Sequence, residues 1–288
     1  MVAEKKILEE IKDLMSIKTM VQTYEEIAAS RMQKVKSSVL SNRDFLNSLY
    51  GIYQQVKHSY DEELKLLQKE GKKPNLSEVR PRNGKTVAVF LSSNAGLYGD
   101  IIRKTFDLFK KSIQGKELDI IIVGKIGQNL FEGMRSSNQS YKYFELADTA
   151  STSEEFSGLI SYVTEYSKVI VYHGQFQSIL SQIPKEEFMS GEVLQADSGV
   201  RQEYDFIYEP SIEKVMSFFE IEIMASIFEQ SLHESSLSKY ASRMISLDRA
   251  VVNIGEKIRY AKFTKQRVRH RIINKKQLSL LSSMSLWS

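Results

Sequence analysis

Two long amphipathic segments, one at each end of the chain, constrain the fold more than any other feature of this sequence. From about Lys5 to Val56 the apolar residues recur at steps of three and four, with no proline and with one glycine, Gly51. The same spacing returns from Ser211 to the C-terminus. It places apolar side chains in a stripe along one side of a helix, and such a stripe needs a partner to bury it. We therefore expect the two segments to pair as an antiparallel coiled coil. The predicted contact residues are Leu14, Val21, Ile27, Met244, Leu247, Val251 and Ile254.

Between these segments the chain alternates between β-rich runs and helical stretches. The four strongest β-rich runs cover residues 86–91, 118–124, 141–146 and 168–174. Helical stretches separate them at 101–112, 128–134 and 153–166. This alternation is typical of an α/β fold with a mainly parallel sheet that is covered on both faces. Weaker runs at 186–194 and 202–210 predict one or two further strands at an edge of the sheet.

These patterns divide the chain into four parts. Residues 70–85 are polar and contain two prolines and two glycines, which is typical of a loop. The predicted parts are an N-terminal coiled-coil helix (1–60), a linker (61–85), a Rossmann-like α/β domain (86–210) and a C-terminal coiled-coil helix (211–288).

The composition excludes several classes of site. The chain has no cysteine, so it has neither disulfides nor thiolate metal sites. No apolar run approaches the roughly 20 residues that span a bilayer. The sequence therefore predicts a soluble intracellular protein. The four histidines show no metal-ligand spacing; they are His58, His173, His233 and His270.

The charge is distributed unevenly although the net charge is only +4. From Lys257 to Ser288 there is no Asp or Glu, and nine Lys or Arg residues lie between Lys257 and Lys276. One interpretation is a solvated basic helix face with a frayed end. The other is a tip that meets acidic partners and ends in an apolar socket. Nucleic acid also attracts such a run, but no recognised DNA-reading motif accompanies it, so we predict no nucleic-acid partner.

Motifs for catalysis or ligand binding are weak. Gly96 and Gly99 lie in the turn after the first predicted strand, where a phosphate could bind, but the three-glycine dinucleotide fingerprint is absent. The sequence 84–86 looks like the end of a phosphate-binding loop but precedes its strand instead of following it. His233 and Glu234 begin a zinc-helix pattern that lacks its second His. We predict no catalytic residue, no cofactor, no metal site and no small-molecule substrate.

Four blocks, in order along nearly the whole chain, carry a resemblance to a known protein family. They are IKDLMSIKTMVQTYEEIAASRMQKV (11–35), VFLSSNAGLYGD (89–100), IIIVGKIGQNLF (120–131) with the later Tyr208 to Ser211, and LHESSLSKYASRMISLDRAVVNIGEKI (232–258). Together they resemble the γ subunit of F-type ATP synthases, the central rotor stalk.

The resemblance implies a function and partners that the residue patterns do not show. It implies a non-catalytic shaft that couples ATP hydrolysis or synthesis in a surrounding ring of α- and β-type subunits to rotation, and through it to proton or sodium translocation. Further implied partners are an ε-like subunit and a membrane c-ring, on the cytoplasmic, inner face of the cell membrane. The predicted contacts at the foot of the shaft, the end near the ε-like subunit and the c-ring, are Tyr208, Glu209, Pro210 and Ser211. The predicted tip contacts with the catalytic ring are Arg267, Arg269, Arg271, Leu278, Leu281 and Trp287.

This sequence also departs from the family pattern. Where the family usually has an Asp-Arg pair after the first strand, this chain has Asn94 and Ala95. Near the C-terminus, Lys276 replaces the family's usual acidic residue, and the chain ends in SMSLWS. Two alternatives therefore stay open. One is a γ-like subunit of a specialised rotary ATPase that does not make ATP. The other is a nucleotide-binding α/β module on a coiled-coil arm.

Overall fold

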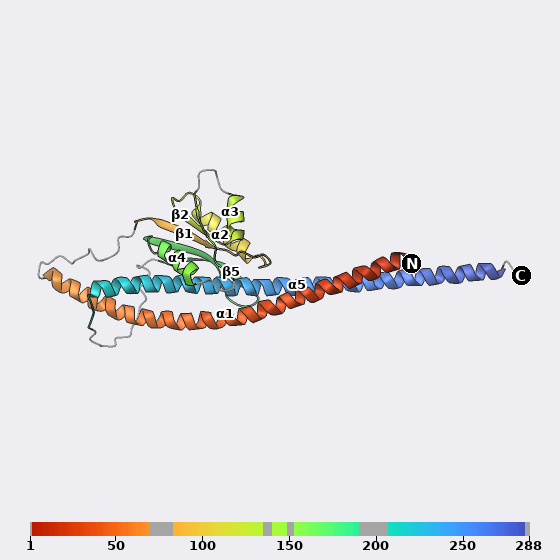
Figure 1. Cartoon of the computed structure of the whole chain (residues 1–288), viewed down its shortest axis with the longest axis horizontal. Coiled ribbons are helices and arrows are strands. Elements are labelled where there is room, and N and C mark those ends of the chain that lie inside the picture. Colours follow the sequence, from red (N-terminus) through yellow and green to blue (C-terminus); the bar gives the residue numbers. More distant parts are fainter. Residues whose placement is uncertain (1, 70–82, 135–139, 149–152, 190–206, 286–288) are drawn as a thin grey trace. The chain divides into compact units, whose positions relative to one another are not determined.

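The computed structural model describes residues 2–69, 83–134, 140–148, 153–189 and 207–285. Two helices dominate them, α1 (Val2–Lys69, 68 residues) and α5 (Ile212–Ser285, 74 residues) (Figure 1). The α1 helix extends nine residues past the predicted boundary at residue 60. The reason is that residues 61–69, assigned to the linker because they are polar, are mostly Glu, Leu, Lys and Gln, which favour helices.

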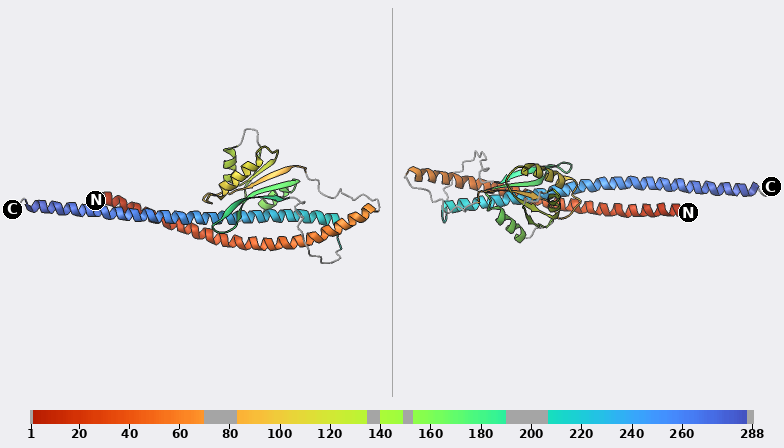
Figure 2. Two further views of the ribbon diagram at one scale, coloured as in Figure 1. Left: turned by 180° about the vertical axis from the view of Figure 1, so that it is seen from behind. Right: turned by 90° about the horizontal axis from the view of Figure 1, so that it is seen from above.

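The chain forms two compact units, and both helices contribute to each of them. Residues 1–30 and 243–288 form the first unit, and residues 31–242 form the second. In the first unit the start of α1 runs antiparallel beside the part of α5 that follows residue 242, and the end of α5 extends beyond the start of α1 (Figure 2). The predicted α/β fold with long terminal helices and a mainly parallel sheet is confirmed.

Burial in the coiled-coil unit follows a seven-residue repeat along α1. Leu14 and Val21 are half-buried, and the next member of the repeat is Ala28, which is 1% exposed. Ile27, the third predicted contact residue of α1, is less buried than the others, since its side chain is 43% exposed. One residue turns a helix by 100°, so Ile27 lies off the line that Leu14, Val21 and Ala28 share. On α5, Leu247 is buried, and the other predicted stripe residues are half-buried; they are Met244, Val251 and Ile254.

The second unit contains a five-stranded sheet with the order β3-β2-β1-β4-β5. The strands are β1 (Thr86–Leu91), β2 (Asp119–Val123), β3 (Lys142–Phe144), β4 (Lys168–Phe176) and β5 (Gln182–Met189). The first four are parallel, and β5 pairs antiparallel with β4. The predicted edge strand at 186–194 thus begins earlier, at Gln182, and its residues 190–194 lie outside the described residues. Residues 202–206 do so too, and 207–210 form no strand.

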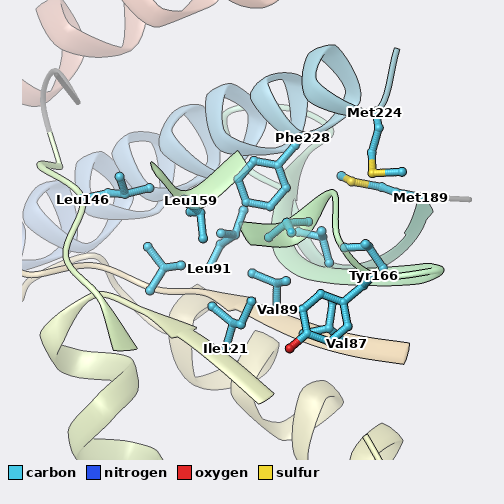
Figure 3. Close-up of a cluster of buried hydrophobic side chains, with 14 residues drawn as sticks. Val87, Val89, Leu91, Ile121, Leu146, Leu159, Tyr166, Met189, Met224 and Phe228 are labelled. Atoms are coloured by element: carbon cyan, nitrogen blue, oxygen red, sulfur yellow. The ribbon is translucent and has the colours of Figure 1, made fainter. Parts of the chain in front are cut away.

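Helices cover both faces of the sheet. The helices α2 (Ile101–Ile113) and α3 (Lys125–Glu132) pack on one face, where aromatic rings fill the core. Phe90 stacks on Phe109 at 5.3 Å between ring centroids, and the ring of Tyr172 meets Phe109 edge-on at 5.3 Å. The helix α4 (Ser153–Val163) covers the other face together with α5. There Phe228 and Met224 of α5 join the apolar core (Figure 3).

The close approach of α5 to the sheet depends on one glycine. A Cβ atom on Gly174, in β4, would lie 2.6 Å from the Ser238 hydroxyl of α5 and 2.7 Å from Cγ1 of Ile101. Real Cβ atoms do not come this close to other heavy atoms, so a larger residue at this position would push α5 or α2 away. The absence of a side chain at Gly174 therefore sets the distance between sheet and helix.

We expect Gly174→Ala to destabilise the α/β unit by about 1–3 kcal/mol, because the added methyl group overpacks a filled contact. Chemical denaturation followed by circular dichroism measures this loss. Gly158→Ala on α4 is the matched control, since its Cβ would meet nothing within 4 Å. That change should be neutral or stabilise by up to ~1 kcal/mol, because Ala favours a helix over Gly. Equal effects of the two changes would contradict the packing argument.

Candidate functional site

The carboxyl ends of parallel strands are the usual ligand site of an open α/β sheet, at the point where the strand order reverses. Here that point lies between β1 and β4. The helix α5 crosses it: Ser238, which is fully buried, lies against Gly174, and Lys239 donates a hydrogen bond from Nζ to the Ser92 carbonyl at 3.0 Å. The position that a dinucleotide takes in a nucleotide-binding fold of this kind is therefore filled by the chain's own helix.

The turn after β1 forms a dense set of hydrogen bonds at this edge. The backbone N–H groups of Asn94 and Ala95 donate to the Asp148 carboxylate, at 3.1 and 2.8 Å to Oδ2. The Asn94 side chain donates from Nδ2 to the Leu146 carbonyl at 2.8 Å and accepts from the Lys125 N–H at 3.0 Å. The two glycines that the sequence suggested for phosphate binding belong to this turn, and one of them, Gly99, has a φ of +63°. Gly99 serves backbone geometry, because few other residues adopt that conformation easily.

A second polar cluster joins β4, β5 and α5. His173 is fully buried, and its Nε2 lies 3.1 Å from Oε2 of Glu187. Ser231 on α5 donates to the same oxygen at 2.8 Å, and Lys185 donates to the other carboxylate oxygen at 3.0 Å. Burial by itself raises the pKa of Glu187, but the hydrogen bonds and charges of His173 and Lys185 outweigh it and lower the pKa to about 2. The hydrogen bonds of His173, Ser231 and Lys185 converge on the Glu187 carboxylate, so the cluster acts as a brace between β4, β5 and α5.

A cavity of about 390 Å³ lies beside the sheet edge, between α1, α5 and the strand ends. Its charged and titratable lining comprises Lys34, Asp148, Glu229, His233 and Lys239. Glu229 pairs with His233 at 3.5 Å, and Lys239 lies 3.8 Å from Asp148. Both signs of charge are present and largely paired with each other. In the part of the chain that the structure describes, no three His, Asp or Glu residues lie close enough to hold a metal ion.

The predicted foot residues lie at the entry to α5. The Tyr208 hydroxyl donates to Ser59 Oγ on α1 at 2.9 Å, which ties this turn to the last third of the first helix. Ser211 caps α5, because its Oγ accepts from the Lys214 N–H at 3.4 Å. Glu209 is exposed. As partner contacts, these residues stay a prediction.

Pro210 does not begin the helix, although proline suits the first helical position because it has no N–H to leave unpaired. The first helical residue is Ile212, two positions later. Ser211 stands between them as the capping residue, and a side-chain oxygen satisfies a free helix N–H better than proline does. Next to this turn, Ile207 is 92% exposed and Phe218 is 61% exposed. No motif or stripe in the sequence marks either residue.

The predicted tip residues belong to the coiled-coil unit. Arg267, Arg269 and Arg271 are exposed, and Leu278 and Leu281 are each 64% exposed. Trp287 lies outside the described residues. Every residue from 271 to 282 is exposed, so the chain itself buries no part of this segment. Two exposed aromatic residues of α5 precede this segment and lie off the apolar stripe, so the sequence pattern does not mark them; they are Tyr260 (74% exposed) and Phe263 (56%).

Sequence reasoning also missed the residues that fix α5 to the sheet. Asp148 and Lys239 follow no motif, and nothing in the sequence pairs them. His173 left a signal, because it is a titratable residue inside an otherwise apolar strand run, KVIVYHG. A buried histidine needs a hydrogen-bonding partner, but the sequence does not say that Glu187 provides it.

Within the described ranges, none of the helices combines the length and the apolar composition that a membrane span requires.

Comparison with known proteins gives matches over nearly the whole chain. A family model described as ATP synthase matches residues 3–282. The ATP synthase gamma chain of Ruthia magnifica subsp. Calyptogena magnifica is 23% identical over 293 residues, covering 98% of each chain. That of Cytophaga hutchinsonii is 25% identical over 293 residues, covering 96% of each.

Two solved structures share the fold. A chain in the central stalk and c-ring structure of the Tetrahymena thermophila mitochondrial ATP synthase has a TM-score of 0.55 at 18% identity, covering 80% of this chain and 99% of that one. A chain in the Euglena gracilis mitochondrial ATP synthase has a TM-score of 0.51 at 13% identity, covering 89% and 94%.

The Glu187 cluster predicts a specific acid sensitivity. The folded pKa of about 2 lies below the value of ~4.3 for an unfolded Glu. The stabilisation is therefore complete above about pH 4.5 and is lost as the pH falls toward 2. We expect Glu187→Gln to remove about 1–3 kcal/mol of this pH-dependent stability, as measured by denaturation at pH 6 and at pH 2.5. Glu117→Gln, at an exposed site, is the control. An unchanged pH dependence in Glu187→Gln would refute the brace.

Proposed function

Since the chain belongs to the ATP synthase family, we propose that it is the central rotor shaft of a rotary ATPase. It has no catalytic role of its own. It couples ATP hydrolysis or synthesis in a surrounding ring of α- and β-type subunits to rotation, and through rotation to the movement of protons or sodium ions. The names of the matched relatives, ATP synthase gamma chains, support this assignment.

One observation carries the proposal: the end of α5 is helical although its own chain does not bury it. Residues 271–282 are exposed all round, and Leu278, Leu280 and Leu281 are each at least 60% exposed. A lone helix with apolar side chains in water is marginal, so this segment needs an apolar sleeve supplied by other subunits. A rotor tip inside a ring of subunits meets that requirement.

The basic run lies just before this apolar end. The run contains Arg267, Arg269 and Arg271, and Lys257 to Ser288 contains no acidic residue that could pair with them internally. Acidic loops of the ring would attract this surface. Exposed ion pairs are worth at most ~1 kcal/mol each and weaken with salt. They would seat the shaft without holding it at one angle, which rotation requires.

The exposed residues at the start of α5 are consistent with contacts to a companion ε-like subunit and a membrane c-ring. The entry turn presents Glu209 to solvent, and the apolar Ile207 and Phe218 lie exposed near it. Protein interfaces have an apolar core with a polar rim, and exposed apolar side chains with a charged residue near them suit such a contact. We place the protein at the inner face of the cell membrane, held there by these partners.

A second candidate is a γ-like shaft of a specialised rotary ATPase that hydrolyses ATP but does not make it. The departures at the tip, among them Lys276 and the SMSLWS ending, favour it. Synthesis of ATP by the reconstituted complex under an imposed ion gradient would decide for the first candidate. Hydrolysis without any synthesis would decide for the second.

The remaining alternative, a nucleotide-binding module, conflicts with the contact between α5 and the sheet. We expect the isolated chain to bind neither ATP nor NAD with a Kd below about 1 mM, because Ser238 and Lys239 fill the crevice. Calorimetry on the pure chain measures this directly. Binding of either nucleotide in the micromolar range would contradict the shaft assignment and favour this module.

We further expect Arg267→Glu, Arg269→Glu and Arg271→Glu together to reduce coupled ATP hydrolysis at low salt by about tenfold. The loss of three ion pairs at about 0.5 kcal/mol each corresponds to about this tenfold reduction in rate. The control reverses three exposed basic residues on α2, Arg103, Lys110 and Lys111, and should behave like the wild type. If the tip variant assembles and turns over like the control, the tip arginines do not meet an acidic ring.

A further inference from the structure

Asp148 lies where three segments of the α/β unit meet. Its carboxylate accepts hydrogen bonds from the backbone N–H groups of Asn94 and Ala95, directly after β1. The side chain of Asn94 donates a hydrogen bond to the Leu146 carbonyl, just after β3. It accepts another from the N–H of Lys125, at the start of α3. One carboxylate thus organises the carboxyl ends of three neighbouring strands.

Two consecutive residues of α5 bind to the same point. Lys239 places its ammonium 3.8 Å from Oδ1 of Asp148, and its side chain is only 11% exposed. Tyr240 donates from its hydroxyl to the Asp148 backbone carbonyl at 3.1 Å. The Tyr240 ring packs edge-on against Tyr98, with 6.0 Å between the centroids. These contacts place one turn of α5 against the strand ends at a defined angle and height.

The identity of residue 94 follows from this arrangement. The Asn94 side chain needs an N–H donor for the Leu146 carbonyl and an oxygen acceptor for the Lys125 N–H, and an amide offers both. A carboxylate at this position would face the Leu146 carbonyl without a proton and would lie next to Asp148. The negative charge at this edge therefore comes from residue 148.

We propose that Asp148 and Lys239 form a joint that fixes α5 to the sheet, so that the α/β domain and this part of the shaft turn as one body. This role for the two residues rests on the proposed rotor function and adds to it the contact that joins the domain to the shaft. Hydrophobic burial alone allows a helix to slide or rotate by small steps, because apolar contacts are not directional. A buried ion pair with directed hydrogen bonds has one best geometry and resists both movements.

The test of the joint is hydrogen exchange on the full chain, without partner subunits. We expect Asp148→Asn to raise the exchange rates of the α5 amides at 235–242, and of Asn94 and Ala95, by at least tenfold. The amides of α4 should keep their rates. Glu145→Gln is the matched control, because Glu145 precedes the same loop but pairs with Lys125 in an exposed contact, 2.9 Å apart. It should change no rate by more than about twofold.

A double-mutant cycle tests whether the two residues act as one unit. If they do, Lys239→Gln alone should raise the same amide rates, and the double variant should exceed the larger single effect by less than about threefold. Independent residues would instead give multiplied effects, near 100-fold. Rates within threefold of wild type in Asp148→Asn, multiplied effects, or an equal rise in α4 would each overturn the joint. If Asp148→Asn does not fold, Lys239→Gln decides by the same criterion.

A separate measurement on the assembled complex tests the mechanical consequence. With Asp148→Asn, the number of ions moved per ATP hydrolysed should fall at least twofold, while the Glu145→Gln complex keeps the wild-type ratio. Loosened α5 amides with a normal coupling ratio would show that the joint exists but transmits no torque, and this would overturn the one-body proposal. A chain that does not join ring subunits at all would instead contradict the rotor function and would leave the exchange result valid.

Discussion

The contact between α5 and the carboxyl edge of the sheet is the interaction on which the rest of the α/β unit depends. It is possible because small residues meet there: Gly174 has no side chain, and α5 presents buried serines at 231, 235, 238 and 242. With larger residues the helix would stand off, and Lys239 would not reach the Ser92 carbonyl. The same contact fills the crevice that a dinucleotide occupies in related folds. In this fold a helix of the chain itself therefore takes the place of a ligand.

Polar and apolar contacts divide the work of holding this helix. Apolar residues of α5, among them Phe228 and Met224, are buried against the sheet, and burial of apolar surface is the main favourable term in folding. Ser231, Lys239 and Tyr240 bind to Glu187, the Ser92 carbonyl and Asp148. Their net contribution to the free energy is small, but they select one position of the helix among many of similar burial. A shaft that transmits rotation needs that selectivity more than it needs further stability.

The two ends of α5 differ in how they are stabilised. Near its start, α5 pairs with α1 within the same unit: Asn42 donates to the Ser226 carbonyl, and Arg43 lies 3.4 Å from Glu234. Toward its end the helix has exposed apolar and basic side chains. The first arrangement is complete within the chain. The second becomes stable when other subunits cover it, which is the physical sense in which this protein is part of an assembly.

The sequence by itself determined the long helices, the parallel sheet and the absence of thiolate chemistry. These features depend on periodicity and composition, which are local: the repeat of three and four residues gives a helix, and continuous β-rich runs give buried strands. The tertiary structure decided the rest. It buried Ala28 and left Ile27 partly exposed, and it began α5 at Ile212, with Ser211 as the capping residue. It also brought Asp148 to Lys239 across 91 positions of sequence. Such pairings depend on the distance between packed elements, which Gly174 sets for this helix, and no local pattern records it.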